Sequence, residues 1–177
     1  MWQRQCIMFI MSEFNIDRYD HTIPADVADQ VSTIFERNYP ESHSTEARAR
    51  DLSRYSGSIA VQSILGEMRS IYTGRENDQI IGMMEVGTAD VGGGVYEQLI
   101  WLMIERTRRG EGFSGMLHRK FIADASERAK QRLPKPSAAT LNVHKGNPAV
   151  SIYNGWGYKV VESKGDKLIM VRPLPGE

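Results

Sequence analysis

The chain has 177 residues, of which 41% are hydrophobic and 25% charged, values that exclude disordered and fibrous proteins and fit one globular domain. Its 22 basic and 22 acidic residues give a formal net charge of zero, whereas a nucleic-acid binder normally carries a basic excess. The single cysteine, Cys6, excludes an intrachain disulfide and indicates a reducing compartment. We therefore expect a cytoplasmic protein without a nucleic-acid partner.

The N-terminal segment differs from the rest of the chain. Residues 6–11 are apolar, but this run is far shorter than the roughly 20 residues that span a membrane, and no small-residue cleavage site follows it. We expect residues 1–12 to be an N-terminal extension and residues 13–174 to form a single domain. No membrane partner is expected.

The first part of the chain predicts one strand followed by helices. Residues 14–19 alternate apolar and polar side chains, which is typical of a strand. Residues 24–37 and 45–68 carry apolar side chains at helical spacing. Gly57 would divide the second of these regions, because glycine costs about 1 kcal/mol inside a helix. The positions expected to face the core are Val27, Val31, Ile34, Phe35, Leu52, Tyr55, Ile59, Ile64 and Met68.

The middle of the chain changes from helical to strand periodicity. Strands are predicted at residues 70–73, 79–86 and 95–105, with a turn at 75–78 and a loop at 87–94 between them. Such short connections favour antiparallel hairpins.

A long amphipathic helix is predicted at residues 113–130, and Pro134 and Pro136 end it. Its apolar residues recur at four-residue steps and therefore share one face. These residues are Phe113, Leu117, Phe121, Ala125 and Ala129.

The C-terminal part predicts a strand at residues 138–143 and a short helix that ends near residue 154. Asn147 would cap this helix and Pro148 would take its first position. Strands at 159–162 and 167–171 would close the fold as a hairpin. The element order β-α-α-β-β-β-α-β-α-β-β predicts an α+β domain with a mixed sheet.

The segment between the third predicted hairpin strand and the long helix is rich in glycine and arginine. Gly110, Gly112 and Gly115 would let the backbone approach a ligand closely, and the first turn of the helix presents N–H groups and a positive dipole end. Such a turn can hold a phosphate group. Arg106, Arg108 and Arg109 add positive charge, although a tight turn with solvated arginines explains the same residues without a ligand.

The three glycines also spell the dinucleotide-binding pattern G-x-G-x-x-G. That pattern requires an acidic residue at the end of the next strand to hold the ribose. Here the strand at 139–143 is followed by His144 and Lys145, so the dinucleotide interpretation is rejected.

The same turn resembles the signature of the GNAT superfamily of acyl-CoA-dependent N-acyltransferases, which is Arg or Gln, two residues, Gly, one residue, then Gly or Ala. It falls on residues 109–114, and Ser114 departs from the pattern at its last position. A second region is similar to the family's later motifs. This region comprises the apolar strand residues Leu141 and Val143, then Asn147, Pro148, Ala149, Ile152 and Tyr153, and the glycine–aromatic turn at 155–158.

This resemblance implies a GNAT-like fold of about seven mostly antiparallel strands, with a central splay and flanking helices. It also implies acetyl-CoA as the co-substrate, bound in the splay, and no metal. The implied cofactor-binding residues are Leu102, Met103, Ile104, Arg109, Gly110, Glu111, Gly112, Phe113, Ser114, Gly115 and Asn147.

By the same resemblance, Tyr153 matches the family's usual proton donor to the departing coenzyme A thiolate. A phenol with a pKa near 10 is a suitable acid for a thiolate whose free pKa is near 8.5. The base that receives the amine proton stays open among Glu85, Glu97, Glu105, His144 and water.

The implied activity is transfer of an acetyl group to a primary amine of a small molecule or peptide, whose identity the mixed charges of the helices and last hairpin leave open. A non-catalytic acyl-CoA-binding module on the same fold is the alternative. Homodimers are common in the family, which leaves a homodimer as an open expectation.

Overall fold

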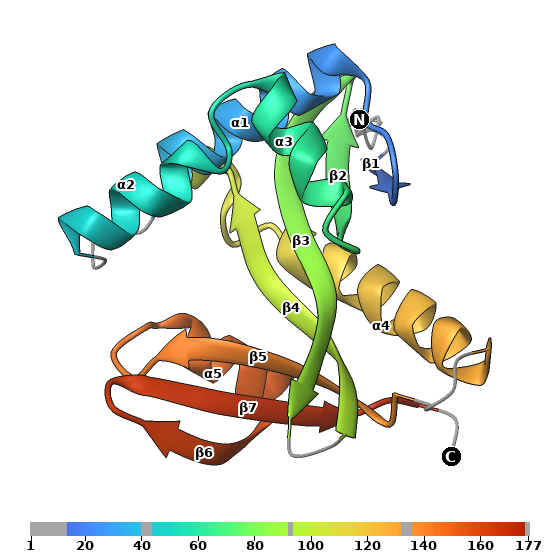
Figure 1. Ribbon diagram of the computed structural model, residues 1–177, viewed down its shortest axis with the longest axis vertical. Coiled ribbons are helices and arrows are strands. Elements are labelled where there is room, and N and C mark those ends of the chain that lie inside the picture. The colour runs from blue at the N-terminus through green and yellow to red at the C-terminus, as the bar shows by residue number, and fades with distance from the viewer. Residues whose placement is uncertain (1–13, 40–43, 92–93, 132–135, 176–177) are drawn as a thin grey trace, which may run out of the picture.

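The computed structural model describes residues 14–39, 44–91, 94–131 and 136–175, so the expected extension at residues 1–12 lies outside the described part. The single domain at 13–174 stays a prediction. The described residues form one seven-stranded sheet in the order β1-β2-β3-β4-β5-β7-β6, with helices against both faces (Figure 1). The elements are β1 (Phe14–Tyr19), α1 (Ala25–Asn38), α2 (Thr45–Ser53), α3 (Ser58–Leu65), β2 (Ser70–Glu76), β3 (Gln79–Val91), β4 (Gly94–Ile104), a 3₁₀ turn (Arg106–Arg108), α4 (Phe113–Gln131), β5 (Ala138–His144), α5 (Ala149–Gly155), β6 (Lys159–Lys164) and β7 (Lys167–Pro173).

Neighbouring strands are antiparallel except for the central pair, β4 and β5, which run parallel. A parallel pair needs a long crossover, and α4 supplies it. The prediction of an α+β domain with a mixed sheet is therefore confirmed.

Two predicted connections are wrong, because both contain residues that belong to strands. The predicted loop at 87–94 is mostly paired backbone, since β3 continues to Val91 and pairs with β4 as far as Val91 and Gly94. The predicted turn at 75–78 is reduced to Asn77 and Asp78, whose φ angles of 49° and 64° fit the two-residue hairpin turn that matches strand twist. Small and polar residues marked these segments as turns, but pairing with a neighbouring strand overrides local preference.

The core lies on both faces of the sheet. On one face, α4 and α5 cover one hydrophobic cluster, and on the other α1 and α3 cover a second. All of the predicted inward residues of α1 and α4 are buried. The apolar positions predicted along 45–68 are only partly correct, because Ile59 and Met68 are exposed. Helix α2 ends at Ser53 and Gly57, with φ 85°, caps the start of α3, so Ile59 does not continue the helical phase of α2. Met68 lies beyond the end of α3 at Leu65.

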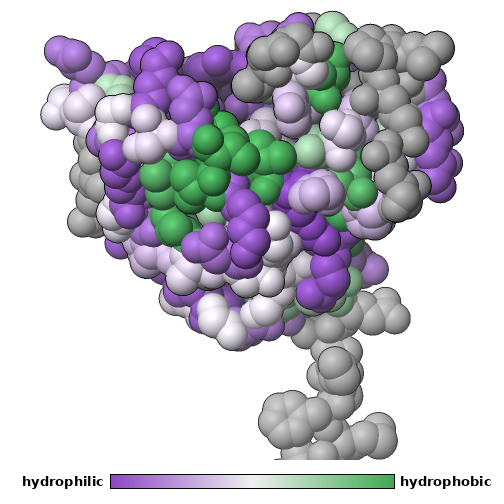
Figure 2. Space-filling view, turned by 90° about the horizontal axis from the view of Figure 1, so that it is seen from below, coloured by the Kyte–Doolittle hydropathy of each residue, from purple (hydrophilic) through white to green (hydrophobic). Residues whose placement is uncertain are grey.

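The far edge of the sheet is formed by β6, whose residues are all exposed. Val160 and Val161 belong to this strand. Figure 2, which looks at the molecule from below the view of Figure 1, shows apolar side chains gathered on the face that carries β6 and β7. The expectation of a homodimer stays a prediction.

Candidate active site

The two central strands separate halfway along their length. Backbone pairing of β4 with β5 runs only from Glu97 and Ala139 to Leu99 and Leu141, after which β4 remains paired with β3 and β5 with β7 but not with each other (Figure 1). Ile100 is an extra residue in β4. Leu99 pairs with Val86 of β3 and Trp101 pairs with Glu85, and because Val86 and Glu85 are adjacent in β3, Ile100 has no partner there. A bulge bends its strand and increases its twist. The bulge at Ile100 lies where the pairing of β4 with β5 ends, and the expected central splay is therefore confirmed.

A cavity of about 1530 Å³ occupies this splay. One wall is the second half of β4, from Gln98 to Ile104, together with the glycine turn and the start of α4. The opposite wall is the end of β5 and the residues leading into α5. The lining residues on this wall are Asn142, Val143, His144, Gly146, Asn147, Pro148, Ala149, Ile152, Tyr153, Trp156, Asp166 and Lys167.

The glycine turn presents its backbone to this cavity. Gly110 and Gly112 have φ angles of 86° and 88°, which only glycine adopts easily, and no heavy atom lies within 4 Å of the position a Cβ would take on either residue. Among the described residues, the protein accepts no hydrogen bond from the amide N–H groups of residues 109–115, and the first bond after the turn runs from Met116 N–H to the Gly112 carbonyl. Open amides at a helix N-terminus fit an anionic group such as a diphosphate.

Two of the predicted arginines hold the turn in place. Arg108 forms ion pairs with Glu76 and Glu111, and its guanidinium lies over the ring of Phe113 at 4.9 Å. The Arg109 Nε donates to the Ile104 carbonyl at 3.2 Å, and its Nη2 donates to Asn38 at 3.4 Å. The guanidinium groups of Arg108 and Arg109 therefore bind other parts of the protein and stabilise the conformation of the glycine turn.

The structure places most of the predicted cofactor residues on the cavity wall. Leu102, Met103, Ile104, Arg109, Gly110, Gly112, Phe113, Ser114 and Asn147 line it, whereas Glu111 and Gly115 do not. The Asn147 Oδ1 accepts a hydrogen bond of 2.8 Å from the N–H of Ala149, but Pro148 and not Asn147 takes the cap position, so the predicted cap is one residue off. The helix itself begins at Ala149, one residue later than predicted. Because the side-chain oxygen of Asn147 binds Ala149, its side-chain NH₂ group can donate to a ligand.

Tyr153 lines the cavity from α5 and packs against the same hydrophobic cluster as α4. Burial raises the pKa of its hydroxyl above the ordinary value, so the group remains a protonated donor at neutral pH. The ring meets Trp156 edge to face at 5.7 Å and Tyr158 at 6.1 Å. Sequence reasoning found Tyr153 but missed Trp156 as a wall residue.

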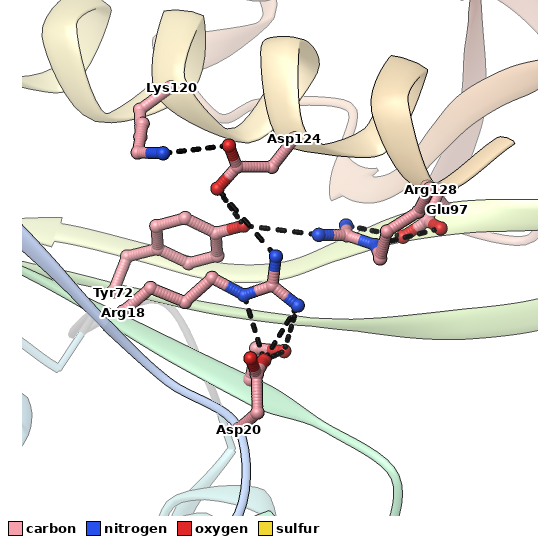
Figure 3. A network of polar contacts seen from close by, with 8 residues as sticks. Arg18, Asp20, Tyr72, Glu97, Lys120, Asp124 and Arg128 are labelled. Carbon is pink, nitrogen blue, oxygen red and sulfur yellow. Dashed lines mark hydrogen bonds and ion pairs between the residues drawn. The ribbon is translucent and has the colours of Figure 1, made fainter. Parts of the chain in front are cut away.

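The base candidates occupy different surroundings. Glu97 forms an ion pair with Arg128 of α4, on the other side of the sheet from α1, within the network of Figure 3. Glu85 is buried and accepts hydrogen bonds from the Tyr55 hydroxyl and Arg69. Of the four side-chain candidates, His144 lines the cavity and the three glutamates do not.

His144 approaches the cavity from the sheet face opposite to Tyr153. Leu141 and Val143 of β5 are buried in the cluster beneath α4, and successive strand residues point to opposite faces. Asn142 and His144 therefore point to the α1 side of the sheet. The His144 Nδ1 lies 2.8 Å from the Asp166 carboxylate, and the N–H of Lys145 donates to the Asp166 carbonyl at 2.9 Å. The β6–β7 turn is thus fixed against the end of β5.

The α1 side of the cavity is closed by residues that the sequence alone did not identify. Ser44, Ala47, Asp51 and Arg54 of α2 and its flanks line it at helical spacing, opposite Trp101 of β4. Asp51 accepts a hydrogen bond of 2.7 Å from the Tyr39 hydroxyl, which ties α2 to the end of α1. Helix α2 itself has no buried residue. No sequence signal distinguishes these residues from solvated helix positions.

No protein-family model and no curated protein sequence matches the chain. Solved structures match it at low sequence identity. The PaiA N-acetyltransferase of Thermoplasma acidophilum, in complex with coenzyme A, is 15% identical over 90% of this chain and 99% of its own, with a TM-score of 0.66. A GNAT-family acetyltransferase of Streptococcus pneumoniae is 15% identical over 92% and 99%, with a TM-score of 0.68.

The ribosomal-protein-S18-alanine N-acetyltransferase of Escherichia coli is also 15% identical, over 93% of this chain and 96% of its own, with a TM-score of 0.62. The chain has the GNAT acetyltransferase fold. At this level of identity the likeness shows the fold and neither an activity nor an acceptor. Among the described residues, no helix is both long and apolar enough to cross a membrane, and no group of three or more His, Cys, Asp or Glu side chains could hold a metal ion.

Proposed function

We propose that this protein is an N-acetyltransferase that moves an acetyl group from acetyl-CoA to a primary amine. The observation that carries the proposal is the continuous cavity that joins the open amides of the glycine turn to the hydroxyl-bearing ring of Tyr153 through the β4–β5 splay. The GNAT fold supports it, and similar structures that contain coenzyme A include the PaiA N-acetyltransferase, the NatC complex and an aminoglycoside 6′-N-acetyltransferase.

The residues present fit the co-substrate. The amides of residues 109–115 would hold its diphosphate, because they sit at the start of the 19-residue helix α4 and have no protein acceptor among the described residues. The backbone of Leu102, Met103 and Ile104 would bind the pantetheine arm as an added strand along the free edge of β4. The amide of Asn147 would donate to the same arm. When bound, acetyl-CoA supplies an acetyl group activated as a thioester.

The chemistry of the wall residues accounts for both protons of the transfer. The amine nitrogen bonds to the acetyl carbon as the carbon–sulfur bond breaks, so the amine loses one proton and the thiolate gains one. The Tyr153 O–H gives its proton to the thiolate from the α5 wall. A proton donor at that position contributes about 10²–10⁴-fold to such a reaction.

His144 is the proposed base. It lines the cavity on the opposite sheet face from Tyr153, so the two groups flank the place where the amine meets the thioester. Asp166 holds its Nδ1 and would stabilise the imidazolium that forms when the ring takes a proton. Glu85 and Glu97, in contrast, are engaged in buried contacts with arginines.

The acceptor is proposed as a small-molecule or peptide amine that enters between α2 and the β6–β7 turn. Similar structures include an aminoglycoside 6′-acetyltransferase and the NatC complex bound to a Gag peptide, so the fold accommodates both kinds. The lining of this side combines arginines with Asp51 and Trp101, and this mixture of charges does not favour a small-molecule amine over a peptide amine.

The test is thiol release from acetyl-CoA against a panel of amines and peptide N-termini. The wild-type chain should release thiol with at least one acceptor class, and Tyr153→Phe should reduce kcat by about 10²-fold or more. Calorimetry should show that Tyr153→Phe still binds coenzyme A, because the phosphate cradle is untouched. Binding of coenzyme A without thiol release by the wild type would instead favour the non-catalytic acyl-CoA-binding module.

A further inference from the structure

His118 is a buried titratable group that the proposed reaction does not use directly. It lies on α4 between apolar neighbours, and only 1% of its surface is exposed. Its Nε2 lies 3.3 Å from the Tyr158 hydroxyl, and its ring stacks on Trp156 with centroids 4.2 Å apart and planes 13° apart. A histidine in this position therefore has two specific partners, and both lie near the end of α5.

These partners close a ring of four aromatic side chains. Trp156 meets Tyr153 at 67°, Tyr153 meets Tyr158 at 68° with 6.1 Å between centroids, and Tyr158 returns to His118 at 5.6 Å. Tyr153 and Trp156 line the cavity, whereas His118 and Tyr158 lie behind them in the core. The ring thus connects the interior of α4 to the cavity wall.

Helix α5 needs such a support because it has little else to fix it. It spans only Ala149–Gly155 and has no fully buried residue. Its contacts with the core come from partly buried side chains, Val150 and Tyr153, and from Trp156 directly after it. The stack on His118 therefore determines where the Trp156 ring lies, and with it the edge against which Tyr153 packs.

The charge of the imidazole determines whether its Nε2 can accept a hydrogen bond from Tyr158. Burial, together with the nearby positive charges of Arg172 and Arg119, lowers the pKa of His118 to about 4. The ring is accordingly neutral near pH 7, and a neutral imidazole has one acceptor nitrogen, which suits the Tyr158 O–H as donor.

We propose that His118 is a positioning residue that holds Tyr153 at the cavity wall by stacking beneath Trp156. The inference rests on the proposed role of Tyr153 as proton donor. His118 itself touches neither the cavity nor a reacting atom, and it acts through the aromatic ring that it completes.

Crystal structures test this directly and without an activity. In His118→Leu the stack is lost, so the Trp156 ring should reorient and the Tyr153 hydroxyl should move from its wild-type place. His118→Phe keeps a flat ring beneath Trp156 and should leave Tyr153 in place. Wild-type placement of Tyr153 in His118→Leu would overturn the proposal. If His118→Leu fails to fold, Trp156→Leu removes the same stack from a partly exposed position and should displace Tyr153 likewise.

A double-mutant cycle on thiol release supplies the second test. His118→Leu alone should lower kcat about 10- to 100-fold, since a displacement of about 1 Å at a reacting group costs up to that much. In a Tyr153→Phe background the same change should cost nothing more. An equal loss in both backgrounds would show that His118 does not act through Tyr153.

Ile122→Ala is the matched control. Ile122 is buried on the same helix and belongs to the same core cluster but is not one of the four ring members, so its truncation lowers stability while the stack of His118 on Trp156 is kept. It should leave kcat unchanged below the melting temperature. Absence of thiol release from the wild type would refute the proposed function alone, because the crystallographic comparison still decides whether His118 positions Tyr153.

Discussion

Arg128 of α4 and Glu97 of β4 form an ion pair across the helix–sheet interface, with Nη2 2.8 Å from Oε2. Arg128 also donates to the Tyr72 hydroxyl, which in turn donates to Asp124, so the pair belongs to a network that fastens α4 to the sheet (Figure 3). Glu97 is 2% exposed and its partner 17%. The carboxylate is therefore a structural group.

Glu97→Gln should destabilise the fold and leave catalysis alone. Removing one partner of a wholly buried pair costs about 3–5 kcal/mol, and the partial exposure of Arg128 reduces this to about 2 kcal/mol. Chemical denaturation should show that loss. Thiol release at 25 °C should match the wild type. A large fall in kcat with unchanged coenzyme A binding would indicate that Glu97 acts as the base.

His144→Gln should lower thiol release about 10²-fold, because the proposed base is lost while the cavity keeps its shape. Asp166→Asn should produce a smaller loss in the same direction, since the ring loses the carboxylate that orients it at 2.8 Å. Steady-state kinetics on both variants provides the measurement. Glu105→Gln is the control, because Glu105 lies outside the cavity lining, and a loss there equal to that of His144→Gln would contradict the assignment.

Gly112→Ala should weaken coenzyme A binding. The φ angle of 88° costs an alanine about 1–2 kcal/mol of strain, although no atom lies within 4 Å of its Cβ. The turn should relax to another conformation and withdraw its amides, which calorimetry with coenzyme A would detect. Gly155→Ala offers the comparison, because that glycine also has open space around it but no positive φ. Equal affinities in the two variants would argue against the amides as the phosphate cradle.

Stability should depend on pH through His118. Its pKa is about 4 in the folded protein and ordinarily near 6.5, so between these values the unfolded chain binds more protons and the free energy of unfolding falls as the pH decreases. The contribution is complete above pH 6.5, and a difference of about 2.5 units corresponds to about 3 kcal/mol lost by pH 4. Denaturation of the wild type and His118→Phe at pH 7 and pH 5 should give a shallower decline for the variant. Parallel declines would exclude His118 as the source.

Much of the architecture was predictable because long helices and paired strands carry regular patterns. The buried stripe of α4 follows from four-residue spacing that any buried face of a helix requires. The loop predicted at 87–94 was wrong because glycine and aspartate within a short segment indicate a turn locally, while the described backbone of β3 pairs with β4 as far as Val91 and Gly94. Ile59 was misplaced because the helix is interrupted before Ser58, and Met68 because α3 ends at Leu65.

The residues of the candidate site were likewise predictable where they belong to local motifs and not where they depend on long-range contacts. The glycine turn, Asn147 and Tyr153 stand in local motifs and could be found in the sequence. The extra residue at Ile100 could not be found in the sequence, since it is defined only by how β4 pairs with β3. Asp51, Trp101 and the contact of Asp166 with His144 depend on segments far apart in the chain, which no local pattern brings together.

Helix α2 forms part of the cavity wall yet contributes no buried residue to the core. Substitutions at such positions typically change stability by no more than about 0.5 kcal/mol, whereas changes to the glycine turn or the β4 bulge disturb the backbone itself. On the proposed function, substitutions of Ala47, Arg50 or Arg54 would alter which amine is accepted while the proposed coenzyme A wall stays as it is. The architecture separates a wall whose side chains can change at little cost in stability from a wall whose backbone geometry is constrained.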